Sequence, residues 1–260
     1  MLTSLQNPLI KQLRKLDSAK ERKASGLFLV EGTHAIEAAH LHNWAFEVIC
    51  ATERWCETHP ELHNELSSKH RFELVNPAIL EALADTVAPS GIVGAVRHQE
   101  RDWKAMLQTP SLLVLGETLQ DPGNLGTIIR TSAAVGADGL LLSADSVDPE
   151  SPKVMRASAG LWFHLPPVRC PDLGEVVETL VAQGVQVLAT AADATHSLWD
   201  LDLRQPTAFV LGSEGQGLSQ ALRSQIPHQV CIPQAHGVES LNVAVSCAVL
   251  LYEAARQRRL

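Results

Sequence analysis

The sequence of 260 residues contains no run of about 18 apolar residues, the length needed to cross a bilayer, so no membrane span is expected. Its first ten residues lack the basic start and the apolar stretch of a secretory signal peptide. The five cysteines include no C-x-x-C pair, which favours reduced thiols in a cytoplasmic protein. Basic residues are fewer than acidic ones, with 21 Lys and Arg against 29 Asp and Glu. The net charge of −8 argues against a protein that coats nucleic acid indiscriminately.

Several catalytic motifs are also missing. No G-x-G-x-x-G follows an expected strand and no G-x-x-x-x-G-K-[ST] occurs, which argues against a standard dinucleotide fold and a P-loop NTPase. No G-x-S-x-G elbow supports a hydrolase. His59 and His63 are four residues apart, but no third ligand accompanies them, so no metal site is expected. Aromatic residues make up only 4% of the chain, which argues against a base-stacking platform of the RRM type.

Short apolar runs alternate with helical patterns in the first part of the chain. The runs are residues 27–30, 46–49, 72–75 and 92–96, and the helical patterns fall near 33–42, 53–67 and 77–86. This alternation predicts a small α/β domain over residues 1–100. The polar stretch 101–110, which ends in Thr-Pro, predicts a linker.

A second series of apolar runs predicts a further domain over residues 111–260. Continuous runs suit strands that are buried on both faces, as in a parallel sheet, and they occupy residues 112–115, 139–142, 185–189, 208–211 and 230–232. A helix is expected to follow the first run, with Asn124 at its start and Gly136 at its end. The last helical segment, residues 241–252, is apolar on nearly every side. Either one subunit encloses this helix or a second subunit covers part of it.

The first 25 residues carry six basic residues against two acidic ones. Such a cluster is typical of a solvated helix face or of an arm that contacts phosphate groups. The six are Lys11, Arg14, Lys15, Lys20, Arg22 and Lys23.

Three glycine-rich or polar segments directly follow expected strands: residues 116–130, 212–218 and 232–242. Ligands of α/β sheets usually bind beyond the carboxyl ends of the strands. Glycine allows the backbone to approach a ligand closely. The three segments are therefore expected to form one pocket.

The order and spacing of these segments resemble the SpoU/TrmH family of RNA 2′-O-ribose methyltransferases, within the SPOUT superfamily. NLGTIIR, from Asn124 to Arg130, resembles the first family motif, and LGSEGQGL, from Leu211 to Leu218, resembles the second. IPQAHGVESLNVAVSCAVLLYEAARQR, from Ile232 to Arg258, resembles the third. SPKVMRASAG at 151–160 is also similar to the family, and residues 4–96 more weakly resemble its N-terminal substrate-binding domain.

The resemblance implies a fold, a cofactor and an assembly. The C-terminal domain is expected to hold a parallel sheet with a deep trefoil knot, beside a smaller N-terminal α/β domain of the L30e-like type. The knot loops are expected to bind S-adenosylmethionine, largely through backbone groups, and the chain is expected to form a homodimer. The implied cofactor contacts are Gly212, Ile232 and Leu241, with Leu211 and Thr190 at the ends of neighbouring strands.

The resemblance also implies transfer of a methyl group to a ribose 2′-hydroxyl of a structured RNA. Arg130 is the expected catalytic residue, either as a proton acceptor helped by an RNA phosphate or as a clamp on that phosphate. Asn124, Glu214, Ser240 and Asn242 are expected to orient Arg130, the ribose or the loops. Ribosomal RNA is favoured over tRNA because of the separate N-terminal domain.

Two other functions remain open at this point. One is a SPOUT enzyme that methylates a base rather than a ribose. The other is an RNA-binding ribosome-assembly factor without catalysis, against which the presence of Asn124, Arg130, Glu214 and Ser240 argues.

Overall fold

The computed structural model describes residues 1–236, 238 and 240–258. The chain divides into two compact units. The first contains residues 1–100 together with 148–164, and the second contains residues 101–147 and those from 165 onward. The short segment 148–164 therefore belongs with the N-terminal unit, whereas the sequence predicted one domain over residues 111–260.

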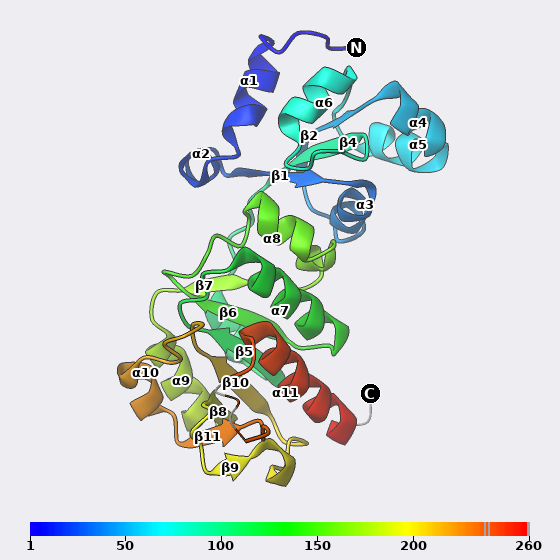
Figure 1. The fold of residues 1–260 in the computed structure, drawn as a ribbon. Helices are drawn as coiled ribbons and strands as arrows, with labels where there is room; N and C mark the ends of the chain where they lie inside the picture. The colour runs from blue at the N-terminus through cyan, green and yellow to red at the C-terminus, as the bar shows by residue number, and fades with distance from the viewer. Residues whose placement is uncertain (237, 239, 259–260) are drawn as a thin grey trace. The chain divides into compact units, whose positions relative to one another are not determined.

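The first unit is built on a mixed four-stranded sheet with the order β1-β4-β2-β3 (Figure 1). β4 is antiparallel to both of its neighbours, and β3 pairs parallel to β2. The predicted strands and helices are present, except that Pro60 starts a new helix and divides the expected helix 53–67 in two. The elements are α1 (Pro8–Lys15), α2 (Ala19–Ser25), β1 (Leu27–Glu31), α3 (Thr33–Leu41), β2 (Phe46–Ala51), α4 (Glu53–Thr58), α5 (Pro60–Lys69), β3 (Phe72–Leu74), α6 (Pro77–Leu83), β4 (Ile92–Arg97), α8 (Pro152–Ala157) and η2 (Leu161–Phe163).

An aromatic cluster explains why segment 148–164 belongs to this unit. Trp162 and Phe163, on η2, pack against Phe28 of β1 and against Trp44, with ring centroids 5.1–6.4 Å apart. All four side chains are almost fully buried. Burial of one large side chain stabilises a fold by about 1.5–3 kcal/mol, so this cluster holds the segment firmly on the first sheet.

Arg22 has a structural role in the same unit, although it lies in the basic N-terminal cluster. Its side chain is 5% exposed. Its guanidinium donates hydrogen bonds to the carboxylate of Asp148 and to the main-chain oxygens of Leu16 and Asp17. The other five members of the cluster are exposed. The prediction that all six basic side chains are available to a ligand is therefore wrong for Arg22.

The second unit contains a seven-stranded sheet with the order β7-β6-β5-β10-β8-β11-β9, in which every pair is parallel. The predicted parallel sheet is thus confirmed, while the short edge strands β7 and β9 were not predicted. The elements are η1 (Trp103–Leu107), β5 (Leu112–Gly116), α7 (Pro122–Ala134), β6 (Gly139–Ser143), β7 (Val168–Cys170), α9 (Leu173–Ala182), β8 (Gln186–Thr190), β9 (His196–Ser197), η3 (Leu198–Asp200), β10 (Thr207–Leu211), α10 (Gln220–Gln225), β11 (His228–Cys231) and α11 (Val243–Arg258).

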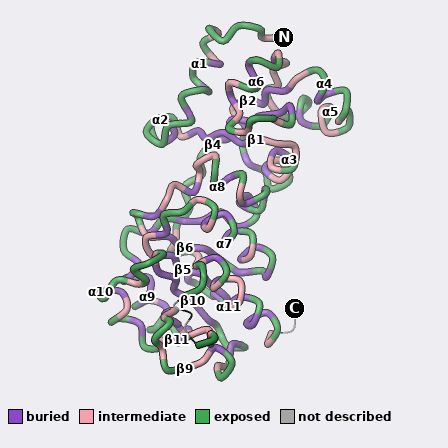
Figure 2. The backbone as a smooth tube through the Cα atoms, viewed as in Figure 1, coloured by how far each residue is buried: buried purple, intermediate pink, exposed green. Residues whose placement is uncertain are grey.

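Helices cover both faces of this sheet. Leu113 and Leu115 of β5 belong to a core cluster with Val176 and Leu180 of α9. The alternate residues of β5 point to the other face, where α7 and α11 pack against each other. As a result, the central strands β5 and β10 are buried along their whole length (Figure 2). Residues 101–110 are not a free linker, since Leu107 of η1 is buried in the same cluster as Leu113.

Two further expectations concern threading and membranes. The trefoil knot remains a prediction, because Gly237 and Glu239 of the segment between β11 and α11 lie outside the described residues. No helix in the described part of the chain is long and apolar enough to cross a membrane.

The buried position of Arg22 makes a direct prediction about stability. Arg22→Met leaves the Asp148 carboxylate and two main-chain oxygens without their donor, so the free energy of unfolding should fall by roughly 2–3 kcal/mol. Lys23→Met, next to it and exposed, should change that energy by less than about 0.5 kcal/mol. Urea unfolding followed by tryptophan fluorescence measures both. Equal stability of the two variants would contradict the structural role.

Candidate active site

The three glycine-rich or polar segments meet at one edge of the parallel sheet. β5 and β10 are neighbours, and Gly116 lies opposite Leu211 where both strands end. The amide of Glu117 donates to the oxygen of Leu211, at 2.9 Å, just as the two chains leave the sheet. The polar residues that follow these strands are therefore brought together by strand pairing.

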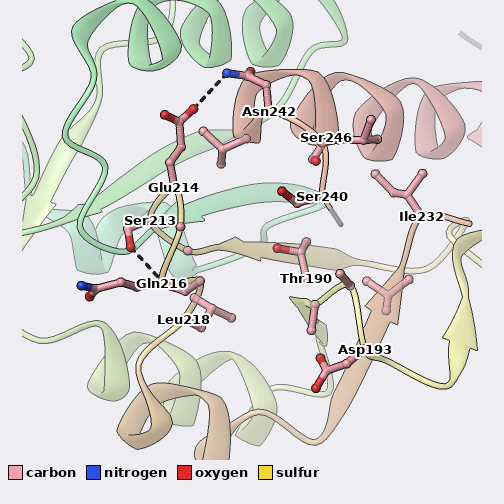
Figure 3. Close-up of a pocket in the computed structure, with 18 of the residues that line it drawn as sticks. Thr190, Asp193, Ser213, Glu214, Gln216, Leu218, Ile232, Ser240, Asn242 and Ser246 are labelled. Carbon is pink, nitrogen blue, oxygen red and sulfur yellow. Dashed lines mark hydrogen bonds between the residues drawn. The ribbon is translucent and has the colours of Figure 1, made fainter. Parts of the chain in front are cut away.

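A triangle of hydrogen bonds connects the three segments. The Nδ2 of Asn242 donates to Asn124 Oδ1, at 3.0 Å, and to Glu214 Oε1, at 2.9 Å. Asn124 Nδ2 also donates to Glu214 Oε1. Figure 3 shows the bond between Asn242 and Glu214. The structure thus places together three of the five predicted catalytic residues, one from each motif.

Asn242 has a second function, because its Oδ1 accepts from the amides of Ala244 and Val245 in the first turn of α11. One side chain therefore both caps this helix and orients its neighbours. Asn124 does not start α7 as predicted. Asp121 is the capping residue, and its carboxylate accepts from the Asn124 amide at 2.7 Å. Asn124 lies within the first turn, which leaves its side chain free to reach Glu214.

The second segment, residues 212–218, folds into a closed turn. Ser213 and Gly217 exchange two main-chain hydrogen bonds of 3.0 Å. A Cβ added to Gly212 would overlap the main-chain carbon of Gly217 and the nitrogen of Leu218. Glycine is therefore required at 212 by the packing of the turn itself. The Glu117 carboxylate fixes the end of the turn by accepting from the amide and the hydroxyl of Ser219, both at 2.7 Å.

A cavity of about 440 Å³ opens beside the triangle (Figure 3). Its volume falls in the usual range for small-molecule sites. Most of the predicted ligand contacts line it, namely Thr190, Gly212, Glu214, Ile232, Ser240, Leu241 and Asn242. Leu211 is buried in β10 behind Gly212, and neither it nor Asn124 is among the lining residues.

Arg130 lies outside this cavity, on the solvent side of α7. Leu125, Ile128 and Ile129 of the same helix are fully buried, as the helical spacing predicted. Among the described residues, Arg130 makes no hydrogen bond or ion pair. Its charge is therefore available to a ligand that approaches from solvent.

Sequence reasoning missed several lining residues. Asp193 follows β8, and its carboxylate accepts two hydrogen bonds from Arg223, which lower the pKa of that carboxyl. Ser246 and Gln234 also line the cavity. Asp193 could have been found from its place just after the apolar run of β8, where ligands of α/β sheets bind. Gln234 lies inside the third motif, but no role was assigned to it.

Gly212→Ala tests whether packing requires glycine in the closed turn. The added methyl group has only backbone atoms in its way, so we expect the free energy of unfolding to fall by about 1–3 kcal/mol and the amides of residues 213–218 to exchange faster. Ser213→Ala keeps the main-chain bonds of the turn and should be nearly neutral. Hydrogen exchange with mass spectrometry measures the effect, and unchanged exchange in Gly212→Ala would refute the requirement.

Both the N-terminal and the C-terminal parts of the chain are similar to known protein families. The model of the SpoU rRNA methylase family matches residues 111–252, and that of the MRM3-like substrate-binding domain matches residues 7–94. An uncharacterized tRNA/rRNA methyltransferase of Synechocystis sp. is 46% identical over 99% of this chain and 94% of its own length. The 23S rRNA (guanosine(2553)-2′-O)-methyltransferase of Bacillus subtilis is 32% identical over 96% of this chain and 97% of its own.

A solved structure agrees with these matches. The SpoU methyltransferase AviRb of Streptomyces viridochromogenes, crystallised in complex with the cofactor AdoMet, superposes with a TM-score of 0.87. It is 30% identical, and the match covers 97% of this chain and 99% of that one. Together with the three connected motifs at the sheet edge, these matches show that the chain belongs to the SpoU rRNA methylase family.

Proposed function

We propose that this protein is an S-adenosylmethionine-dependent methyltransferase that modifies a ribose 2′-hydroxyl of ribosomal RNA. The observation that carries the proposal is the Asn124–Glu214–Asn242 triangle, which joins all three motifs beside a cavity of ligand size. Relatives of similar length are named as 23S rRNA 2′-O-methyltransferases, which favours ribose over a base and ribosomal RNA over tRNA.

The cavity has the properties that S-adenosylmethionine requires. It combines apolar side chains, such as Ile232 and Leu241, with the main chain of the closed turn. It also holds a buried acceptor, Gln234 Oε1, that has no partner among the described residues. When bound, the cofactor supplies an electrophilic methyl group on a sulfonium centre. Gly212, Ile232, Leu241 and Thr190 are the residues proposed to hold it.

Arg130 is proposed to act on the RNA. A guanidinium keeps its proton in proteins and forms paired hydrogen bonds with phosphate. Its exposure and lack of a partner among the described residues favour the clamp over the proton acceptor, since a free cation can hold the phosphate next to the target ribose. Methyl transfer needs oxygen, carbon and sulfur nearly in line, so such positioning should supply much of the rate.

The polar triangle is proposed to position the target nucleotide. Asn124 keeps one side-chain N–H that no described residue uses, and this group can hold a ribose hydroxyl by a hydrogen bond. Glu214 and Asn242 fix the orientation of the Asn124 amide. The exposed Ser240 lines the cavity beside them and offers a further hydroxyl. An assembly factor without catalysis would have no need for these connected polar side chains.

We also propose a cytoplasmic homodimer. Val245 and Tyr252 of α11 are 49% and 58% exposed. They are seven residues apart on one side of the helix, and the exposed Leu241 lies two residues before its start. We call these three residues the apolar stripe. A second copy of the chain that covers this stripe would remove it from water. The five cysteines are free thiols, as expected in the reducing cytoplasm.

Arg130→Ala should lower the rate of methyl transfer to ribosomal RNA by roughly 100-fold or more, the usual cost of losing a charged donor at a reacting centre. Affinity for S-adenosylmethionine should stay within about twofold, because Arg130 does not line the cavity. Transfer of tritiated methyl groups and titration calorimetry measure the two quantities. Arg204→Ala, an exposed arginine paired with Asp202, is the control. Near-wild-type transfer by Arg130→Ala would exclude Arg130 from the reaction.

The basic cluster of α1 and α2 is proposed to bind RNA phosphates. Replacing Lys11, Arg14, Lys15, Lys20 and Lys23 with Gln should flatten the plot of log affinity against log salt, by roughly 0.7–0.9 for each phosphate that the variant no longer neutralises. Arg22 is left unchanged because its loss would disturb the fold.

The matched control for this experiment replaces Lys69, Arg71 and Arg97 of the same unit. Each of these three already pairs with a glutamate, so their removal should alter the salt dependence little. Equal slopes for wild type and the five-residue variant would mean that the cluster is only a solvated helix face.

A further inference from the structure

One polar atom that lines the cavity, the side-chain oxygen of Gln234, accepts no hydrogen bond from the described residues. This oxygen, Oε1, is buried. The Thr190 hydroxyl, in contrast, donates to the oxygen of Val210, and the Asn242 amide is fully engaged in the triangle and the helix cap. A buried acceptor without a donor destabilises the fold that contains it, so this oxygen is explained if a ligand supplies the donor.

Gln234 lies on the side of the cavity away from the triangle. It follows β11, which is two strands from β10 and three from β5. Neighbouring strands are about 4.8 Å apart, so the ends of β11 and β10 are separated by roughly 10 Å. Glu214 follows β10 and Asn124 follows β5. In Figure 3, Ile232 lies across the cavity from Glu214. Gln234 is two residues after Ile232 in the chain.

This arrangement determines which end of the cofactor can reach Gln234. The methyl-bearing sulfur must approach the triangle and the RNA, so another part of the molecule lies toward β11. A glutamine amide matches the edge of adenine, because its oxygen accepts from the 6-amino group while its nitrogen donates to a ring nitrogen. Ile232 and Leu250, which line the same cavity, provide apolar contact for the flat base.

We propose that the Gln234 side chain binds the 6-amino group of the adenine of S-adenosylmethionine and makes the site selective for that group. The inference rests on the proposed function and adds to it a specific side-chain contact with the base. Gln234 is far from the transfer centre, so its loss should raise the KM for the cofactor and leave kcat nearly unchanged.

The test compares two ligands by titration calorimetry. They are S-adenosylhomocysteine and its analogue with hydrogen in place of the 6-amino group. Wild type should prefer the amino form by roughly tenfold, the value of one well-made hydrogen bond. Gln234→Met, of similar length but without a strong acceptor, should bind the amino form roughly tenfold more weakly and the analogue about as well as wild type. The preference should then disappear.

Two further variants complete the design. Gln234→Glu keeps an acceptor oxygen and should keep the preference, even where overall affinity falls. Gln183→Met carries the same substitution as Gln234→Met, at an exposed position after α9, and should match wild type. If Gln234→Met retains the wild-type preference, the inference is overturned while the proposed function stands. If wild-type protein binds neither ligand, with or without RNA, the proposed function itself fails.

Discussion

The amide nitrogen of Asn242 makes two hydrogen bonds on which the geometry of the site depends. They reach Asn124 and Glu214, which are 118 and 28 residues away in the chain. The same side chain caps α11 through its oxygen. The cap fixes the rotamer of Asn242, and α11 packs against α7, which carries Asn124. Glu214 is held by the closed turn after β10. A site of this kind needs little rearrangement when a ligand binds.

The closed turn after β10 provides the second constraint. Gly212 permits the main chain to fold back so closely that no other residue fits, and Glu117 holds the far end of the turn. The turn presents main-chain groups to the cavity with few side chains in between. On the side of the cavity formed after β8 and β11, Asp193 is already paired with Arg223, whereas the oxygen of Gln234 has no partner among the described residues.

Much of this was predictable because the signals are local. Continuous apolar runs predicted the buried strands, and helical spacing placed Arg130 on the exposed side of α7. The family motifs named residues that the structure does bring together. The edge strands β7 and β9 were not predicted, because Val-Arg-Cys and His-Ser contain no continuous apolar run.

Other features depend on distant partners and could not be predicted. Arg22 was counted among free basic residues, because its partner Asp148 is 126 residues away. Segment 148–164 joins the first unit through aromatic contacts that no local pattern reveals. The start of α7 at Asp121, in contrast, had a local signal, because Pro122 follows it and proline is favoured at the first helical position.

The central claim is that this chain methylates a ribose of ribosomal RNA, and the most direct measurement is mass-spectrometric mapping of modified nucleosides in RNA from cells with and without the protein. We predict that one 2′-O-methylated nucleotide of ribosomal RNA disappears when the protein is removed and returns with the wild-type chain but not with Arg130→Ala. Unchanged ribose methylation, or loss of a methyl group from a base, would contradict the claim.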